Sequence, residues 1–445
     1  MSTLPNTWVE TNLGTVVPYG ATVKAEPEDL TPDTWVLELE DIEKDTTKVL
    51  QRLTFSVRQS KSTKNRFDAG DVLYGKLRPY LNKVAFAEQP GVCTTEIVPI
   101  KPNDAVNGRY LFHWLRHPKF LDYVTKVSHG VNMPRLGTEA GRQAPFVLAP
   151  KNEQKRISDK LDTLLARVDA VNTRLARVAP ILKRFRQSVL AAATSGRLTG
   201  DWREANLSTF AWDDCQIGDL LREKPRNGYS PKAVDHETPV RSLTLSATTT
   251  GRFRPECFKF IPDGISPDSH LWIVKGDVLI QRANSLEYVG TSAVVDVQLD
   301  GYIYPDLMMK CRANDRTSSA FLHLLLSSAD IRRYFREHAT GTAGNMPKIN
   351  QQTVISAPCR VPPTNEQTEI VRRVEMLFGY ADRLEARLQA AQTAADRLTP
   401  ALLAKAFRGE LVPQDPNDEP ASELLRRLQQ EAPATSTRRG RKSAA

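Results

Sequence analysis

The sequence contains few cysteines and no long apolar run. Its 445 residues include five cysteines, an odd number that is widely spaced, without a CxxC pair or the spacing of zinc ligands. No stretch approaches the roughly eighteen apolar residues of a membrane span, and the start, MSTLPNTWVETNLG, lacks the features of a signal peptide. These absences argue against a disulfide-rich secreted protein, a zinc module and a membrane protein, and they predict a cytoplasmic location.

The sequence also lacks the motifs of an enzyme that modifies or cuts DNA unaided. It has no glycine-rich cofactor loop and no Asn/Asp-Pro-Pro-aromatic motif, to which VPPT at 361–364 is only superficially similar. The nearest match to a nuclease metal motif, Pro32-Asp33 with Glu38 and Glu40, lacks the lysine. The glycines at 341–344 lack the Lys-Ser/Thr of a phosphate-binding loop. We therefore predict no catalytic residue, no cofactor and no metal.

The composition is that of a folded protein with a basic character. Hydrophobic residues make up 40% and charged residues 25% of the chain, which is ordinary for globular domains. The length predicts at least two domains. The formal net charge of +9 favours a polyanionic partner, because lysine and arginine release counterions from nucleic acid when they bind it.

The strongest pattern is an internal repeat. Three landmarks recur at an offset of 213 residues, namely NMPR at 132–135 with NMPK at 345–348, NEQ at 152–154 with NEQ at 365–367, and GRL at 196–198 with GEL at 409–411. Weaker echoes precede them, with Trp8 matching Trp212 and GDVL at 70–73 matching GDVL at 276–279. Each half is therefore a globular part followed by one long helix.

The helices are predicted from a heptad pattern that is itself repeated. Apolar residues alternate in steps of four and three, and adding 213 gives an apolar residue each time. The first series is Ile157, Leu161, Leu164, Val168, Val171, Leu175, Val178, Leu182, Phe185 and Val189, and the second is Ile370, Val374, Leu377, Ala381, Leu384, Leu388, Ala391, Ala395, Leu398 and Leu402. Pro180 and Pro400 should kink or break the two helices, because proline removes a helical hydrogen bond.

These patterns predict a mixed α/β (α+β) fold with pseudo-two-fold internal repetition. Two globular domains at 1–150 and 201–361 are separated by two antiparallel coiled-coil helices at 151–200 and 362–412, and a C-terminal segment at 413–445 ends in a basic tail at 436–445. Strands are expected at 71–74, 97–100, 271–280 and 291–297, and helices at 110–126 and 318–338. The two helices would hold the globular domains at a fixed separation, as recognition of a split DNA site requires.

Candidate DNA-binding residues are cations and amides in the globular parts. The cluster RQSKSTKNR at 58–66 suits phosphate contact, although a solvated loop would have the same composition. Arginine can bind guanine, and asparagine or glutamine can bind adenine. The predicted DNA-binding residues are Arg58, Lys61, Lys64, Arg66, Arg78, Arg135, Arg252, Arg254, Arg282, Asn284, Lys348, Gln351 and Gln352.

Several segments resemble those of type I restriction-modification specificity subunits. PKNEQKRISDKLDTLLARVDAV and PPTNEQTEIVRRVEMLFGYADRLEARL are similar to the constant segments of that family, FRGELVPQDPNDEPASELLRRL to its close, and GDVLYGKLRPYL and GDVLIQR to its target recognition domains. The resemblance implies an inactive subunit that recognises a bipartite, asymmetric site in double-stranded DNA. It also implies two modification (methyltransferase) subunits bound to the constant helices, and restriction subunits with endonuclease and translocase activity.

Three alternatives stay open at the level of sequence. The chain could serve a related restriction system of different subunit composition, which its genomic neighbours would decide. A coiled-coil scaffold that binds other proteins would have no salt-sensitive affinity for DNA. An enzyme with an unrecognised site would methylate or cut DNA without a partner.

Overall fold

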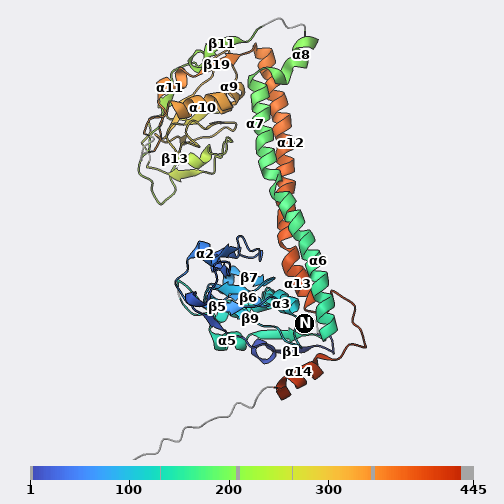
Figure 1. Ribbon diagram of the computed structural model, residues 1–445. Coiled ribbons are helices and arrows are strands. Elements are labelled where there is room, and N and C mark those ends of the chain that lie inside the picture. Colours follow the sequence, from blue (N-terminus) through green and yellow to red (C-terminus); the bar gives the residue numbers. More distant parts are fainter. Residues whose placement is uncertain (1–3, 131, 207–210, 263, 342–345, 432–445) are drawn as a thin grey trace, which may run out of the picture. The chain divides into compact units, whose positions relative to one another are not determined.

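The computed structural model describes residues 4–130, 132–206, 211–262, 264–341 and 346–431 (Figure 1). The chain divides into two compact units, of which unit 1 comprises Met1–Leu175 with Ala391–Ala445 and unit 2 comprises Ala176–Ala390. Residues 342–344 of the glycine-containing loop, Asn345 of the repeated motif and the basic tail at 436–445 lie outside the described residues. Each unit combines helices and strands, so the predicted mixed α/β fold is confirmed. Among the described helices, none has the length and apolar character needed to span a bilayer.

Unit 1 contains three small sheets. A five-stranded sheet has the order β2 (Lys24–Ala25), β5 (Lys64–Phe67), β8 (Gly91–Cys93), β3 (Trp35–Leu37) and β4 (Leu53–Thr54). A three-stranded sheet has the order β7 (Val84–Phe86), β6 (Val72–Gly75) and β9 (Ile97–Ile100), and β1 (Val9–Asn12) pairs with β10 (Pro145–Leu148). Helices α3 (Gly108–Trp114) and α4 (Pro118–Val127) pack on the three-stranded sheet through one apolar core.

Unit 2 repeats this arrangement with different loops. A four-stranded sheet has the order β12 (Arg226–Asn227), β18 (Met308–Cys311), β15 (Val278–Gln281) and β16 (Ser292–Val294). A second sheet has the order β14 (Phe258–Phe260), β13 (Arg241–Leu243) and β17 (Tyr302–Ile303), and β11 (Asp213–Gln216) pairs with β19 (Pro358–Val361). Helices α9 (Ser319–Ser327) and α10 (Ala329–Glu337) correspond to α3 and α4.

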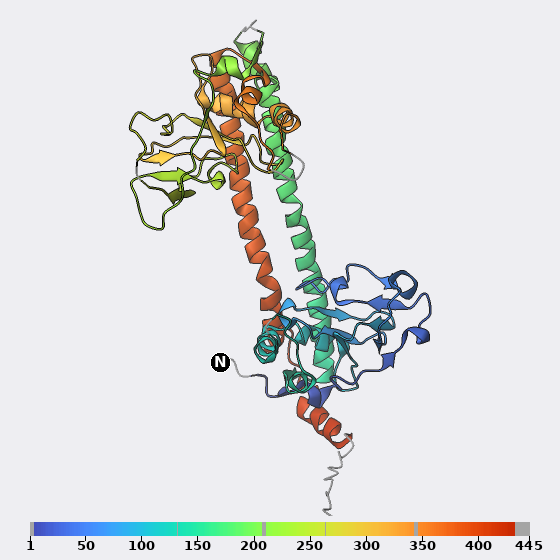
Figure 2. The ribbon, with the colours of Figure 1, turned by 90° about the vertical axis from the view of Figure 1, so that its left-hand side faces the viewer.

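The long helices begin where the two-stranded ladders end. Helix α6 (Lys151–Ala176) follows β10, and helix α12 (Thr364–Asp396) follows β19. Helix α7 (Val178–Thr194) follows α6, and helix α13 (Leu398–Ala406) follows α12. In unit 2, α7 and the first part of α12 lie side by side, and in unit 1 α13 lies beside α6 (Figures 1 and 2). Arg186 of α7 pairs with Asp382 and Glu385 of α12 at 2.6 and 2.9 Å.

Both long helices are interrupted three residues before the proline. Arg177 separates α6 from α7 and Arg397 separates α12 from α13, with φ and ψ of −77° and −17° at the first and −80° and −16° at the second. Proline at position i cannot donate to the carbonyl at i−4, and its ring clashes with that carbonyl. For Pro180 and Pro400 this carbonyl belongs to the last residue of α6 and of α12. The expected interruption is present, although the backbone stays in the right-handed helical region.

Most heptad positions are shielded from solvent. Leu161, Val168, Val374 and Leu388 are buried. Leu164, Leu175, Leu377 and Leu384 are partly buried. Two predicted positions differ, because Val171 is 43% exposed and Leu398 is 45% exposed.

The repeated Asn-Glu-Gln motif attaches each long helix to its globular part. In unit 1 the buried carboxylate of Glu153 accepts hydrogen bonds from Nε1 of Trp8, at 2.8 Å, and from Nε2 of Gln414. Burial raises the pKa of Glu153. The amide of Gln154 donates to the carbonyl oxygens of Ala105 and Ala149, both at 2.9 Å. The motif therefore satisfies backbone groups that would otherwise be buried without partners.

Unit 2 uses the same chemistry at the same positions of its repeat. Glu366 accepts from Oγ1 of Thr199 at 2.7 Å and from Nε1 of Trp212 at 3.3 Å, and it also pairs with the guanidinium of Arg203. Gln367 donates to the carbonyl oxygens of Arg316 and Pro362. The matching tryptophans of the sequence repeat are thus the donors that the two glutamates require.

The glycine that follows each long helix has the left-handed backbone of a helix C-cap. Gly409 has φ of +76°, and a Cβ atom there would lie 2.4 Å from Cγ of Pro5. We expect Gly409→Ala to lower the free energy of unfolding of unit 1 by about 2 kcal/mol, from backbone strain and the clash. Gly70→Ala is the matched control, since Gly70 has φ of +93° with open space around it. Equal losses in urea unfolding of the two variants would contradict the assigned clash.

A histidine at the start of α4 predicts a pH dependence of stability. Nδ1 of His117 accepts the amide hydrogen of Lys119 at 3.1 Å, and its ring stacks on Trp114 with centroids 5.0 Å apart. Burial lowers the pKa of His117 to about 4. The unfolded chain therefore binds the proton first, and this contribution to stability is present above pH 6.5 and is lost as pH falls towards 4.

We expect the free energy of unfolding of unit 1 to drop by about 2 kcal/mol between about pH 7 and about pH 5 through this group. His117→Asn keeps a side-chain oxygen that can cap α4 but does not titrate. Chemical unfolding at the two pH values measures the difference. The same pH dependence in wild type and variant would contradict this prediction.

Candidate nucleic-acid interface

The two best-preserved motifs of the globular parts lie next to each other in both units. In unit 1 the amide of Arg78 donates to the carbonyl of Pro134 at 2.7 Å, and the amide of Leu136 donates to the carbonyl of Lys76 at 3.0 Å. In unit 2 the backbone amide of Asn284 donates to the carbonyl of Pro347 at 3.2 Å, and the backbone amide of Ile349 donates to the carbonyl of Arg282 at 2.9 Å. The turn after the GDVL strand therefore pairs with the Met-Pro segment twice, in the same way.

An isolated antiparallel bridge supports each Met-Pro segment. His129 and Arg135 exchange backbone hydrogen bonds at 2.9 and 3.2 Å, and Thr340 and Lys348 do so at 2.9 Å in each direction. The backbone frame is thus common to both units. The side chains on it differ, since Lys76, Arg78 and Arg135 of unit 1 take the places of Arg282, Asn284 and Lys348 of unit 2.

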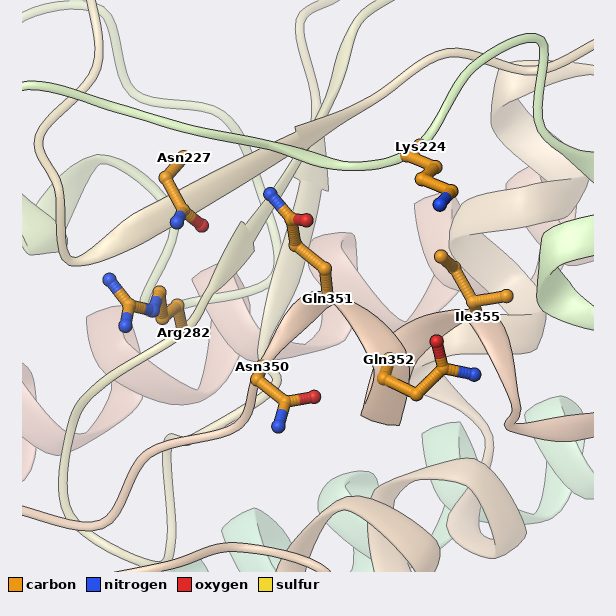
Figure 3. A pocket seen from close by; sticks show the side chains of 7 residues that line it. All are labelled: Lys224, Asn227, Arg282, Asn350, Gln351, Gln352 and Ile355. Carbon is orange, nitrogen blue, oxygen red and sulfur yellow. The ribbon is translucent and has the colours of Figure 1, made fainter.

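A polar pocket opens beside this frame in unit 2 (Figure 3). Its volume is about 350 Å³. The lining residues come from β12 and the preceding loop, the turn after β15, and the short helix α11 (Gln351–Ile355) with its N-cap. They are Lys224, Asn227, Arg282, Asn350, Gln351, Gln352 and Ile355. None of these described lining residues is a carboxylate, so the pocket suits a ligand rich in hydrogen-bond acceptors.

Arg282 is fixed at the edge of the pocket by its own unit. Its Nη1 atom donates to the carbonyl of Asp306 at 3.3 Å, and its Nε is buried without a partner among the described residues. The Nη2 atom of Arg282 makes no hydrogen bond within the described residues, so it is the part of the guanidinium that can donate to a ligand in the pocket. The neighbouring Asn284 has an internal role instead. Its side-chain Nδ2 donates to Oε1 of Gln281, and its Oδ1 accepts from the backbone amide of Ser285, both at 2.7 Å.

Three more side chains of the pocket are free to contact a ligand. Lys224, Asn227 and Gln351 make no side-chain hydrogen bond or ion pair within the described part of the chain. In Figure 3 the amide of Gln351 lies between Asn227 and Lys224, and Arg282 lies below Asn227. The other amides are engaged, since Asn350 caps α11 by accepting from Thr353 and Gln352 donates to Ser356 at 2.8 Å.

Unit 1 presents different groups at the same places. At the 213-residue offset, Gly137, Thr138 and Glu139 replace the amides at 350–352. Arg78 is exposed with a left-handed backbone, φ +50°. Nε of Arg135 lies 3.1 Å from a carboxylate oxygen of Glu96. The frame therefore carries three cations in unit 1, and two cations with several amides in unit 2.

The cluster at 58–66 is mostly engaged in internal ion pairs. The side chain of Lys64 is 4% exposed, and its Nζ lies 2.7 Å from Glu38. Arg58 is likewise 12% exposed and pairs with the buried Asp41. Arg66 is more open, with Asp29 at 3.9 Å, and Lys61 is exposed. Sequence composition did not reveal the distant carboxylates that hold Arg58 and Lys64.

The remaining predicted cations of unit 2 lie away from the pocket lining. Arg252 pairs with Asp382 on α12, and Arg254 pairs with Glu256 at 2.8 Å. Lys348 is exposed, and its backbone forms the antiparallel bridge with Thr340 described above. Over the ranges that the structure describes, no three His, Cys, Asp or Glu side chains are grouped so that they could hold a metal ion.

Known proteins are similar to this chain in sequence and in fold. Residues 5–179 match the family described as the type I restriction modification DNA specificity domain. The chain is 31% identical over 317 residues to the specificity subunit of the type I restriction enzyme EcoKI of Escherichia coli (strain K12), covering 71% of this chain and 68% of that protein. It is 31% identical over 319 residues to the StySPI specificity subunit of Salmonella potsdam, with the same two coverages.

Solved structures agree at the level of the fold. One, from work on complex assembly and conformational transition of the type I R-M system, has a TM-score of 0.70 at 20% identity and covers 92% of this chain and 99% of its own. The crystal structure of the HsdS subunit from Thermoanaerobacter tengcongensis has a TM-score of 0.54 at 20% identity, covering 92% and 98%.

Two α/β units built on one frame, each joined to a long helix, define a DNA-specificity protein of the restriction-modification class. The chain belongs to the family of type I restriction enzyme specificity subunits. Recognition of a DNA target is the role that follows from this family.

Proposed function

We propose that this chain is a non-catalytic subunit in which the globular parts at 1–150 and 201–361 each recognise one half of a bipartite, asymmetric DNA site. One observation carries the proposal, namely that a common backbone frame bears different polar side chains in the two units. In unit 1 the contacting groups are Lys76, Arg78 and Arg135. In unit 2 they are Lys348 and the pocket. Because the hydrogen-bonding groups differ, the two half-sites differ as well.

The long helices are the proposed docking sites for two modification subunits, which restriction subunits join. Support comes from two large side chains on α12, Met376 and Tyr380, which are 57% and 54% exposed one turn apart. An exposed apolar pair on a helix suits contact with another protein. The complex would act in the cytoplasm, where its DNA lies. A related system of different subunit composition would use the same surfaces, and the modification subunit that copurifies decides between them.

The proposal predicts that methyl transfer requires a partner. The purified chain, incubated with DNA and S-adenosylmethionine, should transfer no methyl groups, and adding its modification subunit should give sequence-specific methylation. The affinity of the complex for DNA should fall steeply with salt, since phosphate contacts release counterions. Methylation by the lone chain would contradict the proposal. Salt-insensitive or absent DNA binding by the complex would favour a protein scaffold instead.

A further inference from the structure

We propose that the pocket of unit 2 recognises a G·C base pair by its major-groove edge, with Arg282 binding the guanine. The inference rests on the proposed function and adds the base that one half-site must contain. It is built on the four side chains described above, which are Lys224, Asn227, Arg282 and Gln351.

Arg282 sets the requirement for the ligand. A guanidinium only donates hydrogen bonds, and Nη1 of Arg282 donates to the backbone carbonyl of Asp306 while Nη2 makes no hydrogen bond within the described residues. The ligand must therefore bring acceptors to this corner of the pocket. In the major groove, guanine offers two neighbouring acceptors, O6 and N7, whereas adenine offers N7 beside a donor amino group. Guanine is the base that leaves no donor of Arg282 facing another donor.

The free amides match a base pair more completely than a phosphate. Asn227 and Gln351 each offer an acceptor oxygen as well as donors, whereas phosphate oxygens only accept and would leave the amide oxygens unused. The cytosine that pairs with guanine presents its N4 amino group as a donor in the same groove. The amide oxygen of Gln351, between Asn227 and Lys224 in Figure 3, suits that donor. Lys224, a compact cation at the far side, suits the backbone phosphate.

Unit 1 supports the assignment by contrast. The position of Arg282 is taken by Lys76, a point charge without the planar fork of arginine, and Gln351 is replaced by Thr138. The combination of fork and amide is therefore specific to unit 2. The base pair is therefore assigned only to the second half-site, which is the one recognised by the globular part at 201–361.

The test maps methylated motifs in DNA from cells that express the full complex with wild-type chain or with a variant. Arg282→Ala should remove about 10- to 100-fold discrimination at one G·C pair of the second half-site, so that this position becomes degenerate. Arg282→Lys keeps a cation without the fork and should relax the same position. Lys224→Ala should weaken the binding of all DNA sequences alike. It should also reduce, by about one, the slope of the logarithm of the binding constant against the logarithm of the salt concentration.

Arg333→Ala is the matched control, because Arg333 is an exposed arginine that pairs with Asp330 on α10 outside the pocket lining. It should leave the motif unchanged. Melting curves of each complex identify any variant that does not fold, and Arg282→Lys then serves as the second test. An unchanged motif in both folded Arg282 variants, or a change in the first half-site, would overturn the inference. If the wild-type complex showed no sequence-specific methylation at all, the proposed function would be overturned instead.

Discussion

Replacing Glu366 with alanine should lower the free energy of unfolding of unit 2 by about 3–5 kcal/mol, because it leaves a partly buried cation without its partner. The Glu366 side chain is 1% exposed and pairs with Arg203, whose own side chain is 27% exposed. The same carboxylate accepts from Thr199 and Trp212, which would lose an acceptor inside the unit. These contacts join the start of α12 to the segment after α7, so the change should loosen both.

Hydrogen exchange of peptides from unit 2, measured against urea concentration, gives the loss without assuming that both units unfold together. Glu366→Gln keeps the shape and one acceptor and should cost less than alanine. Glu375→Ala is the control for helix propensity, because Glu375 is exposed on the same helix and has no ion pair within the described residues. If Glu366→Ala behaves like Glu375→Ala, the attachment does not depend on this carboxylate.

The second large effect is on sequence specificity. A chain in which the globular part at 1–150 is replaced by a second copy of the part at 201–361 should recognise the same half-site twice. The reason is that the side chains on the repeated frame, and not the frame itself, differ between the units. Because the repeat has pseudo-two-fold character in sequence, the asymmetric target should become symmetric.

The methylated motif of the duplicated chain measures this directly, in a complex with the same modification subunit. The control is a chain with only Lys76→Arg and Arg78→Asn, which places two of the three unit 2 side chains on the unit 1 frame and adds none of the other residues that line the pocket of unit 2. It should alter the first half-site without copying the second. A motif that keeps the original first half-site in the duplicated chain would refute independent recognition by the two parts.

The local elements were largely predictable from sequence. The expected strands at 71–74 and 97–100 correspond to β6 and β9, and those at 271–280 and 291–297 overlap β15 and β16. The two expected helices are each divided, since α4 starts at Pro118 and Ser328 caps the start of α10. Proline at a first helical position and serine at an N-cap both mark the start of a helix. The apolar pattern that continues across them led instead to the prediction of one helix in each place.

The site was only partly predictable, because long-range contacts build it. Arg282 and Gln351 were identified by residue type, whereas Lys224 and Asn227 were missed because no local motif marks them. The pairing of the GDVL turn with the Met-Pro segment joins residues more than fifty positions apart, for example Arg78 and Pro134. That the two best-preserved motifs recur in the same order in both halves was the one available signal of this contact.

The most direct test of two different recognition surfaces on one repeated frame is the methylated motif made by the complex with wild-type chain. Single-molecule sequencing of DNA from cells that carry the complex measures it. The result expected here is a motif of two unlike specified segments with an unspecified gap between them. A continuous motif, or one with two identical inverted segments, would contradict it.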